Sequence, residues 1–204
     1  NNSYGVVNSS SSSPSMTDVT ASGTGSANNS YGVVNSSSSS PSMSNVTATA
    51  GGAGIANYGV VNDAASSPSM SNVTATATGG TNNRGVYNYS SSSPSMTNVT
   101  ATATGGTNNF GVYNEASSPS MNNVTATATG GTDNYGVSNI SSSPSVRSSS
   151  FTGDDYSIYN SGSSSAQVAD TMLDGTVDAG GGLTCVGAYD ETFVALDEVC
   201  AVIP

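Results

Sequence analysis

Few side chains of this chain could do covalent chemistry. Its 204 residues include no histidine and no lysine, and only two arginines stand against thirteen acidic residues. Asp154 and Asp155 form an adjacent carboxylate pair, and serine runs such as residues 36–40 supply hydroxyls. A serine hydroxyl needs a neighbouring base to become a nucleophile, and none accompanies these runs. We therefore predict that the chain is not an enzyme and that it has no catalytic residue and no cofactor.

Metal, nucleic-acid and membrane binding are also poorly supported by the sequence. Asp170, Asp174 and Asp178 could make a weak cation site, but a solvated acidic turn explains them better. The glycine-rich turns lack the aspartates and the short period of calcium-binding repeats. A chain with two bases cannot neutralise a phosphate backbone, and no apolar run has the length of a membrane span. We expect no metal, no nucleic acid and no membrane insertion.

Threonine occupies every second position in several segments. In "VTATAT", residues 99–104, β-strand alternation puts Val99 and the two alanines on one face and Thr100, Thr102 and Thr104 on the other. Nothing else nearby could fill a core, so the apolar face must point inward. The threonines therefore point outward, where they present hydroxyl and methyl groups to solvent.

A repeat of 25–27 residues carries these threonine segments. Its "SSP" proline recurs at Pro14, Pro41, Pro68, Pro94, Pro119 and Pro144, and a period of this length is typical of solenoids. Each copy has three apolar columns: a valine after glycine, a methionine after "PS", and a valine before the threonines. Each column lies in a short alternating stretch between Gly, Ser or Asn turns. The pattern predicts three short strands per coil and about seven to eight coils over residues 1–175.

Asparagine forms two further columns. One ends the first strand of each copy and comprises Asn8, Asn35, Asn62, Asn88, Asn114, Asn139 and Asn160; the other precedes the third strand and comprises Asn45, Asn72, Asn98 and Asn123. Because asparagine tolerates left-handed backbone and its amide can bond a stacked neighbour, both columns indicate internal ladders at tight turns. We prefer this interpretation to the glycosylation motif that "NVT" also matches. The register resembles the right-handed parallel β-helix proteins of the pectate-lyase-like class, which implies an all-β right-handed solenoid.

The outward threonines then form an array with coils about 4.8 Å apart. The array comprises Thr20, Ser22, Thr47, Thr49, Thr74, Thr76, Thr78, Thr100, Thr102, Thr104, Thr125, Thr127 and Thr129. Strand propensity alone would explain threonine, but not the absence of charge from these columns. Paired T-x-T columns on one flat face of a β-solenoid resemble the ice-binding surface of antifreeze proteins. The resemblance implies binding to ice or ordered water.

Two other surfaces keep alternative functions open. An aromatic column comprises Tyr4, Tyr31, Tyr58, Phe110, Tyr135 and Tyr156 and is interrupted by Arg84. Strict alternation points it the same way as the core valines, near a turn, and Arg84 indicates that its tips reach solvent. Stacked aromatics at a coil edge are one interpretation, and sugar binding is the other. Asp154 and Asp155 resemble the aspartates of β-helix polygalacturonases, but the histidine and the arginine–lysine pair of those enzymes are missing. We interpret the two aspartates as turn residues.

The C-terminal segment, residues 176–204, is expected to leave the repeat and to cap it. Nine of the thirteen acids lie from Asp154 onward, and both cysteines lie in this segment. A disulfide between Cys185 and Cys200 would close a loop of about 15 residues and stabilise the chain by about 3 kcal/mol. Two buried thiols are the alternative. The disulfide, the missing lysine and the polar surface indicate a secreted or cell-surface protein. Upstream coils of the same parent protein, or a partner, would cover the N-terminal end.

Three functions remain in order of support. The first is an ice-binding protein or module that uses the threonine array. The second is a structural or adhesive module of a larger surface protein, and the third is a carbohydrate-binding β-helix.

Overall fold

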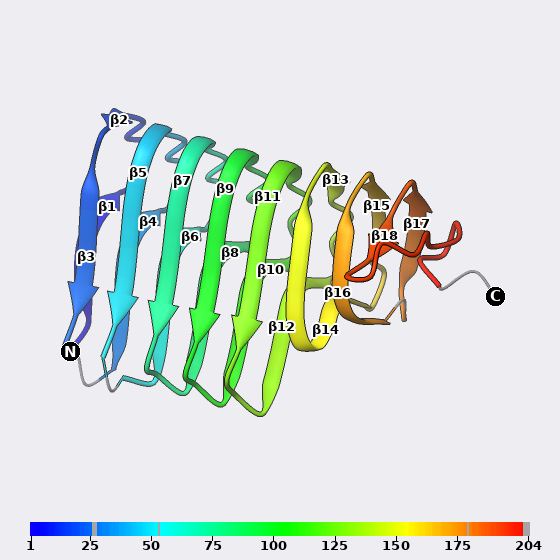
Figure 1. The fold of residues 1–204 in the computed structure, drawn as a ribbon. Coiled ribbons are helices and arrows are strands. Elements are labelled where there is room, and N and C mark those ends of the chain that lie inside the picture. Colours follow the sequence, from blue (N-terminus) through cyan, green and yellow to red (C-terminus); the bar gives the residue numbers. More distant parts are fainter. Residues whose placement is uncertain (26–27, 53, 179, 202–204) are drawn as a thin grey trace.

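The chain folds as a parallel β-solenoid. The structure is a computed structural model that describes residues 1–25, 28–52, 54–178 and 180–201. These residues contain no helix, and their strands build about six turns. In Figure 1 the strands in front run downward and the chain returns behind them while it advances from the N-terminal to the C-terminal end, which makes the winding right-handed. This count is slightly lower than the seven to eight coils expected.

One coil consists of two named strands, the second of which is bent. The third coil begins with β6 (Ala56–Asn62), turns at the "SSP" segment and continues into β7 (Ser69–Thr78). Asn72 lies within β7 and has φ of 53°, a left-handed conformation that bends the strand. In the first coil the same bend separates two strands. Three straight segments per coil are therefore present, as the repeat predicts.

The strands stack on the equivalent strands of neighbouring coils, like residue on like. One stack holds β1 (Ser3–Asn8), β4 (Asn29–Asn35), β6, β8 (Asn82–Tyr89), β10 (Asn108–Glu115) and β12 (Asp133–Ile140), and continues in β14 (Ser150–Ser161) and β16 (Met172–Asp178). The other strands are β2 (Ser15–Thr17), β3 (Thr20–Thr24), β5 (Ser42–Gly51), β7, β9 (Ser95–Thr104), β11 (Ser120–Thr129), β13 (Ser145–Arg147), β15 (Ser165–Ala169), β17 (Gly182–Val186) and β18 (Tyr189–Asp190).

The three apolar columns form the core. Met43, Met70, Met96 and Met121 are each 1% exposed, and Val146 and Val168 continue their column. The valines of the other two columns are equally buried from the second coil onward. The coils before β14 thus contribute the same small set of core side chains, which keeps them alike in cross-section.

The two asparagine columns differ in burial. The amide nitrogen of Asn35 donates to the Asn62 side-chain oxygen at 2.9 Å, and every link of this first ladder is buried. In the second ladder Asn98 donates to Asn72 at 3.0 Å, but these side chains are exposed to solvent. The second column is therefore not internal as expected, because its left-handed backbone turns the side chains outward at the bend.

The C-terminal segment remains part of the solenoid further than expected. β17 pairs in parallel with β15 and aligns Cys185 with the core residue Val168, so the expectation that residues 176–204 leave the repeat entirely is wrong for this strand. The predicted disulfide between Cys185 and Cys200 is confirmed, with the two α-carbons 5.4 Å apart. It ties the loop after β18 across the end of the core.

Candidate functional site

The threonine array lies on the short strand β3 and on four neighbouring long strands, β5, β7, β9 and β11. Their register pairs Thr74 with Thr47 on one side and with Thr100 on the other. Figure 1 shows these strands side by side on one face, with little change of direction from coil to coil. Residues far apart in sequence are thus brought into three ranks by strand pairing alone.

The three ranks differ in exposure. The first rank, Thr20, Thr47, Thr74, Thr100 and Thr125, is exposed to solvent; the second, Ser22, Thr49, Thr76, Thr102 and Thr127, is half-buried except for the exposed Ser22; and in the third Thr78, Thr104 and Thr129 are half-buried. None of these side chains is fully buried. The ranks closer to the glycine turns are more sheltered, but part of each side chain remains accessible to solvent.

The structure extends the array beyond the residues that the sequence indicates. Thr125 pairs with Ser150 and Thr127 with Thr152, so the first two ranks continue for one more coil. They end where Met172 and Asp174 take the next positions. The sequence signal was weak here because "SSSFTG" has a phenylalanine and a glycine in place of the inner alanines. Thr24 likewise heads the third rank, and Gly51 interrupts it.

Glycine residues back the array at close range. A β-carbon on Gly85 would lie 2.7 Å from the Thr102 backbone nitrogen and 2.9 Å from the Ala101 carbonyl carbon. Gly32, Gly59 and Gly111 face the threonine strands in the same way. The sheet behind the array therefore touches it backbone to backbone, and the alanines between the threonines leave room for this contact. The sequence reasoning missed these glycines, although their repetition after each aromatic residue was visible.

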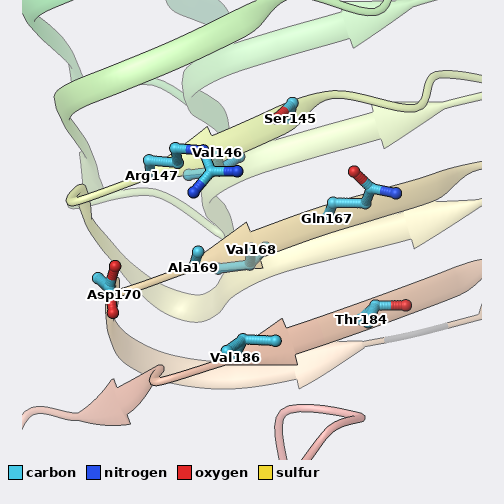
Figure 2. Close-up of a pocket in the computed structure, with 9 residues that line it drawn as sticks. All are labelled: Ser145, Val146, Arg147, Gln167, Val168, Ala169, Asp170, Thr184 and Val186. Carbon is cyan, nitrogen blue, oxygen red and sulfur yellow. The ribbon is translucent and has the colours of Figure 1, made fainter.

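The surface on the other side of the Asn72 bend carries serines and ends in a shallow hollow. Figure 2 shows this hollow, of about 330 Å³, which forms where the small Ala169 lies between Arg147 and Val186. Gln167 and Thr184 line its other side. No residue of the threonine array borders it, whereas Asp170 does.

The aromatic column forms a stack that lies outside the core. The rings of Tyr4 and Tyr31 are 4.9 Å apart with an interplanar angle of 5°, and those of Tyr31 and Tyr58 are 5.1 Å apart. Tyr58 also stacks on Tyr87 of the neighbouring strand β8. The expectation that the aromatic column points with the core valines is therefore wrong, because the glycine that follows each ring breaks the alternation.

Arg84 replaces a ring in this stack and lies among aromatic side chains. Its guanidinium carbon is 4.9 Å from the Tyr87 ring centre and 4.7 Å from that of Tyr113, and it also contacts Tyr58 and Phe110. Because neighbouring rings and Arg84 cover the ring faces, the inner part of the stack offers little flat surface to a sugar.

Burial shifts the acid–base behaviour of the aromatic stack. The Tyr87 hydroxyl donates to a Glu115 carboxylate oxygen at 2.8 Å. Burial, with this hydrogen bond and the Glu115 charge, raises the pKa of Tyr87 strongly above its ordinary value. This tyrosine is neutral and holds its hydrogen bond throughout the physiological range.

Asp154 and Asp155 act on backbone groups. Asp155 accepts hydrogen bonds from the Asn134 backbone nitrogen at 2.7 Å and from its side-chain nitrogen at 3.4 Å, and Asp154 accepts from the Gly130 nitrogen. In the earlier coils a glycine turn separates the threonine strand from the next strand, whereas β14 continues through this position as one strand. The two aspartates therefore cover the last of the glycine turns. No other catalytic group accompanies it in the described residues.

The described part of the chain has neither a group of three or more Cys, Asp or Glu side chains placed to hold a metal ion nor a helix that could span a membrane. A scan against protein-family models and a search of curated proteins each found no match. Function must therefore be argued from the surfaces themselves.

Proposed function

We propose that this chain is an ice-binding protein or module that acts through the threonine array. The observation that carries the proposal is the in-register pairing of solvent-accessible threonines over successive coils. The chain resembles the antifreeze β-solenoids in the T-x-T pattern of this surface, and the resemblance does not imply common descent. The ligand would be ice or a layer of ordered water, held by hydroxyl and methyl groups in a two-dimensional pattern.

Rigidity of the array supports this function. A surface that orders water must present its groups in a constant pattern, because each mobile side chain adds an entropic cost. The β-branched threonine has few rotamers, and backbone contact with the glycines fixes the height of each strand. Side chains placed in this way are ordered before the ligand arrives.

The lack of charge also supports it. No acidic or basic residue lies in the three ranks from Thr20 to Thr152, although the chain as a whole has a net charge of −11. A charged group orients the water molecules around it, and this arrangement competes with an ice-like one. An uncharged row of hydroxyls does not orient water in that way. Nine of the thirteen acids lie from Asp154 onward, away from most of the array.

Thermal hysteresis and ice shaping measured on the purified chain test the proposal. Thr74→Tyr and Thr100→Tyr place large rings in the centre of the first rank and should abolish most of the hysteresis. Ser69→Tyr and Ser95→Tyr serve as matched controls, because they lie on the same two strands but beyond the bend, and both serines are exposed. The controls should retain the wild-type hysteresis.

Two results would contradict the proposal. A folded wild-type chain without hysteresis at high concentration would exclude it, and so would equal hysteresis in the array variants and in the wild type. In either case a structural or adhesive module of a larger surface protein becomes the better explanation. We place the protein outside the cell or at its surface, on the strength of the disulfide and the acidic, lysine-free composition.

A further inference from the structure

The N-terminal end of the solenoid leaves its core open. Within the described residues β1 pairs only with β4, and β2 and β3 pair only with β5, so one edge of each strand has no partner. Val6 and Val19 are partly exposed there, whereas their equivalents Val33 and Val46 are 0% and 1% exposed. Tyr4 is 50% exposed because one face of its ring has no neighbour. In every inner coil the corresponding side is covered by the preceding coil. The N-terminal edge therefore exposes a surface that is buried between coils elsewhere in the solenoid.

The two ladders that reach this edge present acceptors to it. Asn8 donates its amide nitrogen to Asn35 at 2.9 Å, so the ladder runs away from the edge and the Asn8 side-chain oxygen receives no donor from the described residues. The second ladder runs the other way and ends where Asn45 donates to the Asp18 carboxylate at 3.0 Å. Asp18 can only accept, and none of the described residues donates to its second carboxylate oxygen.

These acceptors restrict what could cover the edge. A second copy that meets it with its own N-terminal edge would bring acceptors at the same two ladder positions, with antiparallel strands and no ring in register with Tyr4. The C-terminal end of a second copy is closed by the disulfide-bonded loop and carries Asp190, Glu191, Asp197 and Glu198. Neither end of another copy complements Asp18.

We infer that the N-terminal edge is a docking surface for one more coil of this same repeat, stacked in parallel and in register. An asparagine at each ladder position of that coil donates its amide nitrogen to the Asn8 oxygen and to Asp18. Its tyrosine stacks on Tyr4, and its valines cover Val6 and Val19. Asp18 then accepts from both sides and joins two ladders of opposite direction. The inference is independent of what the threonine array binds.

A chain extended by one coil tests this inference. A copy of residues 29–55 placed directly before Asn2 keeps the 27-residue spacing of the first two copies. Hydrogen exchange of the β1 and β3 amides should then slow by about tenfold or more relative to the original chain and approach that of β4 and β5. Exchange in β7 serves as the internal control, because β7 lies three coils away from the new segment and its exchange should not change.

Two further measurements separate the possible occupants. Asn35→Asp and Asn45→Asp, made in the added copy only, set acceptors against acceptors and should return β1 exchange to the rate of the original chain. If β1 is not protected in the first extended chain, or is equally protected with the two aspartates, the inference is wrong. A concentration-dependent dimer of the original chain that Tyr4→Lys abolishes would also overturn it, because a second copy would then be the occupant.

Discussion

A β-carbon placed on Gly85 would lie 2.7 Å from the backbone nitrogen of Thr102, so the sheet behind the threonine array touches it directly. Backbone atoms cannot move aside as a flexible side chain can, and Gly85 has a conformation that alanine could otherwise adopt. A larger residue at position 85 would therefore destabilise the coil and also push Thr102 outward from the second threonine rank.

Gly85→Ala should lower the free energy of unfolding by about 1–3 kcal/mol, the usual cost of overpacking a core. It should also reduce thermal hysteresis, because Thr102 is pushed out of its rank. Chemical denaturation and hysteresis measure the two effects. Gly51→Ala is the control, because the nearest atom to its β-carbon is a threonine side-chain oxygen at 3.1 Å. Equal stability of the Gly85 variant and the wild type would contradict the close contact.

Gly51→Thr should complete the third rank between Thr24 and Thr78, with which Gly51 pairs. The new hydroxyl lies beside the Thr78 side chain and adds a group to the array without entering the core. We expect a modest rise in thermal hysteresis and a change in stability of no more than about 1 kcal/mol, because the nearest atom to the added β-carbon is the Thr78 side-chain oxygen at 3.1 Å. Gly51→Ala lacks the hydroxyl and should leave hysteresis unchanged. A rise of the same size in both variants would show that rigidity, and not the added hydroxyl, is responsible.

Ser30→Asn should extend a third asparagine ladder that the sequence analysis did not identify. In it Asn57 donates to Asn83 and Asn83 to Asn109, each at 3.0 Å. Ser30 pairs with Asn57 in register, and the Ser30 hydroxyl oxygen and the Asn57 side-chain oxygen are buried without a partner in the described residues.

An amide at position 30 would donate to Asn57 and raise the free energy of unfolding by about 1–2 kcal/mol, because an unmade buried hydrogen bond is costly. Thermal unfolding checks this prediction. Ser30→Ala removes one unpaired oxygen but supplies no donor, and should stabilise the chain less. If alanine stabilises the chain as much as asparagine does, the ladder is not the cause.

Alkaline pH should destabilise the protein through its aromatic stack. Burial, the largest cause in each case, raises the pKa of Tyr31, Tyr87, Tyr113 and Tyr135 above the ordinary value of 10.0. The unfolded chain loses these protons near pH 10 while the folded chain retains them. The stabilisation is therefore complete below about pH 10 and declines as the pH rises further.

Denaturation at a series of alkaline pH values, with phenolate absorbance recorded in parallel, tests this direction. Tyr87→Phe removes the group whose pKa is raised most clearly, so its stability should decline less steeply above pH 10. An unchanged slope in this variant would contradict a role for Tyr87.

The sequence predicted the coil well because a repeat reports the same local geometry several times. The methionine and valine columns indicated the core, and the alternation of "VTATAT" placed the threonines outside. Alternation failed at the aromatic column, because a glycine between Tyr58 and Val60 breaks the period of two. Burial of the second asparagine column could not be predicted either, since an amide ladder forms equally well inside a turn or on its surface.

The sequence by itself determined which residues stack, because like residues recur at corresponding positions of every 25–27-residue copy and an in-register solenoid brings them together. Tertiary structure decided what those stacks do. Only the approach of Gly85 to Thr102 shows that the array is backed by another backbone, and only the donor direction of each ladder shows that Asp18 lies at a receiving end. The physical reason is that spacing specifies neighbours along the solenoid, whereas contact across the coil and hydrogen-bond direction depend on three-dimensional packing.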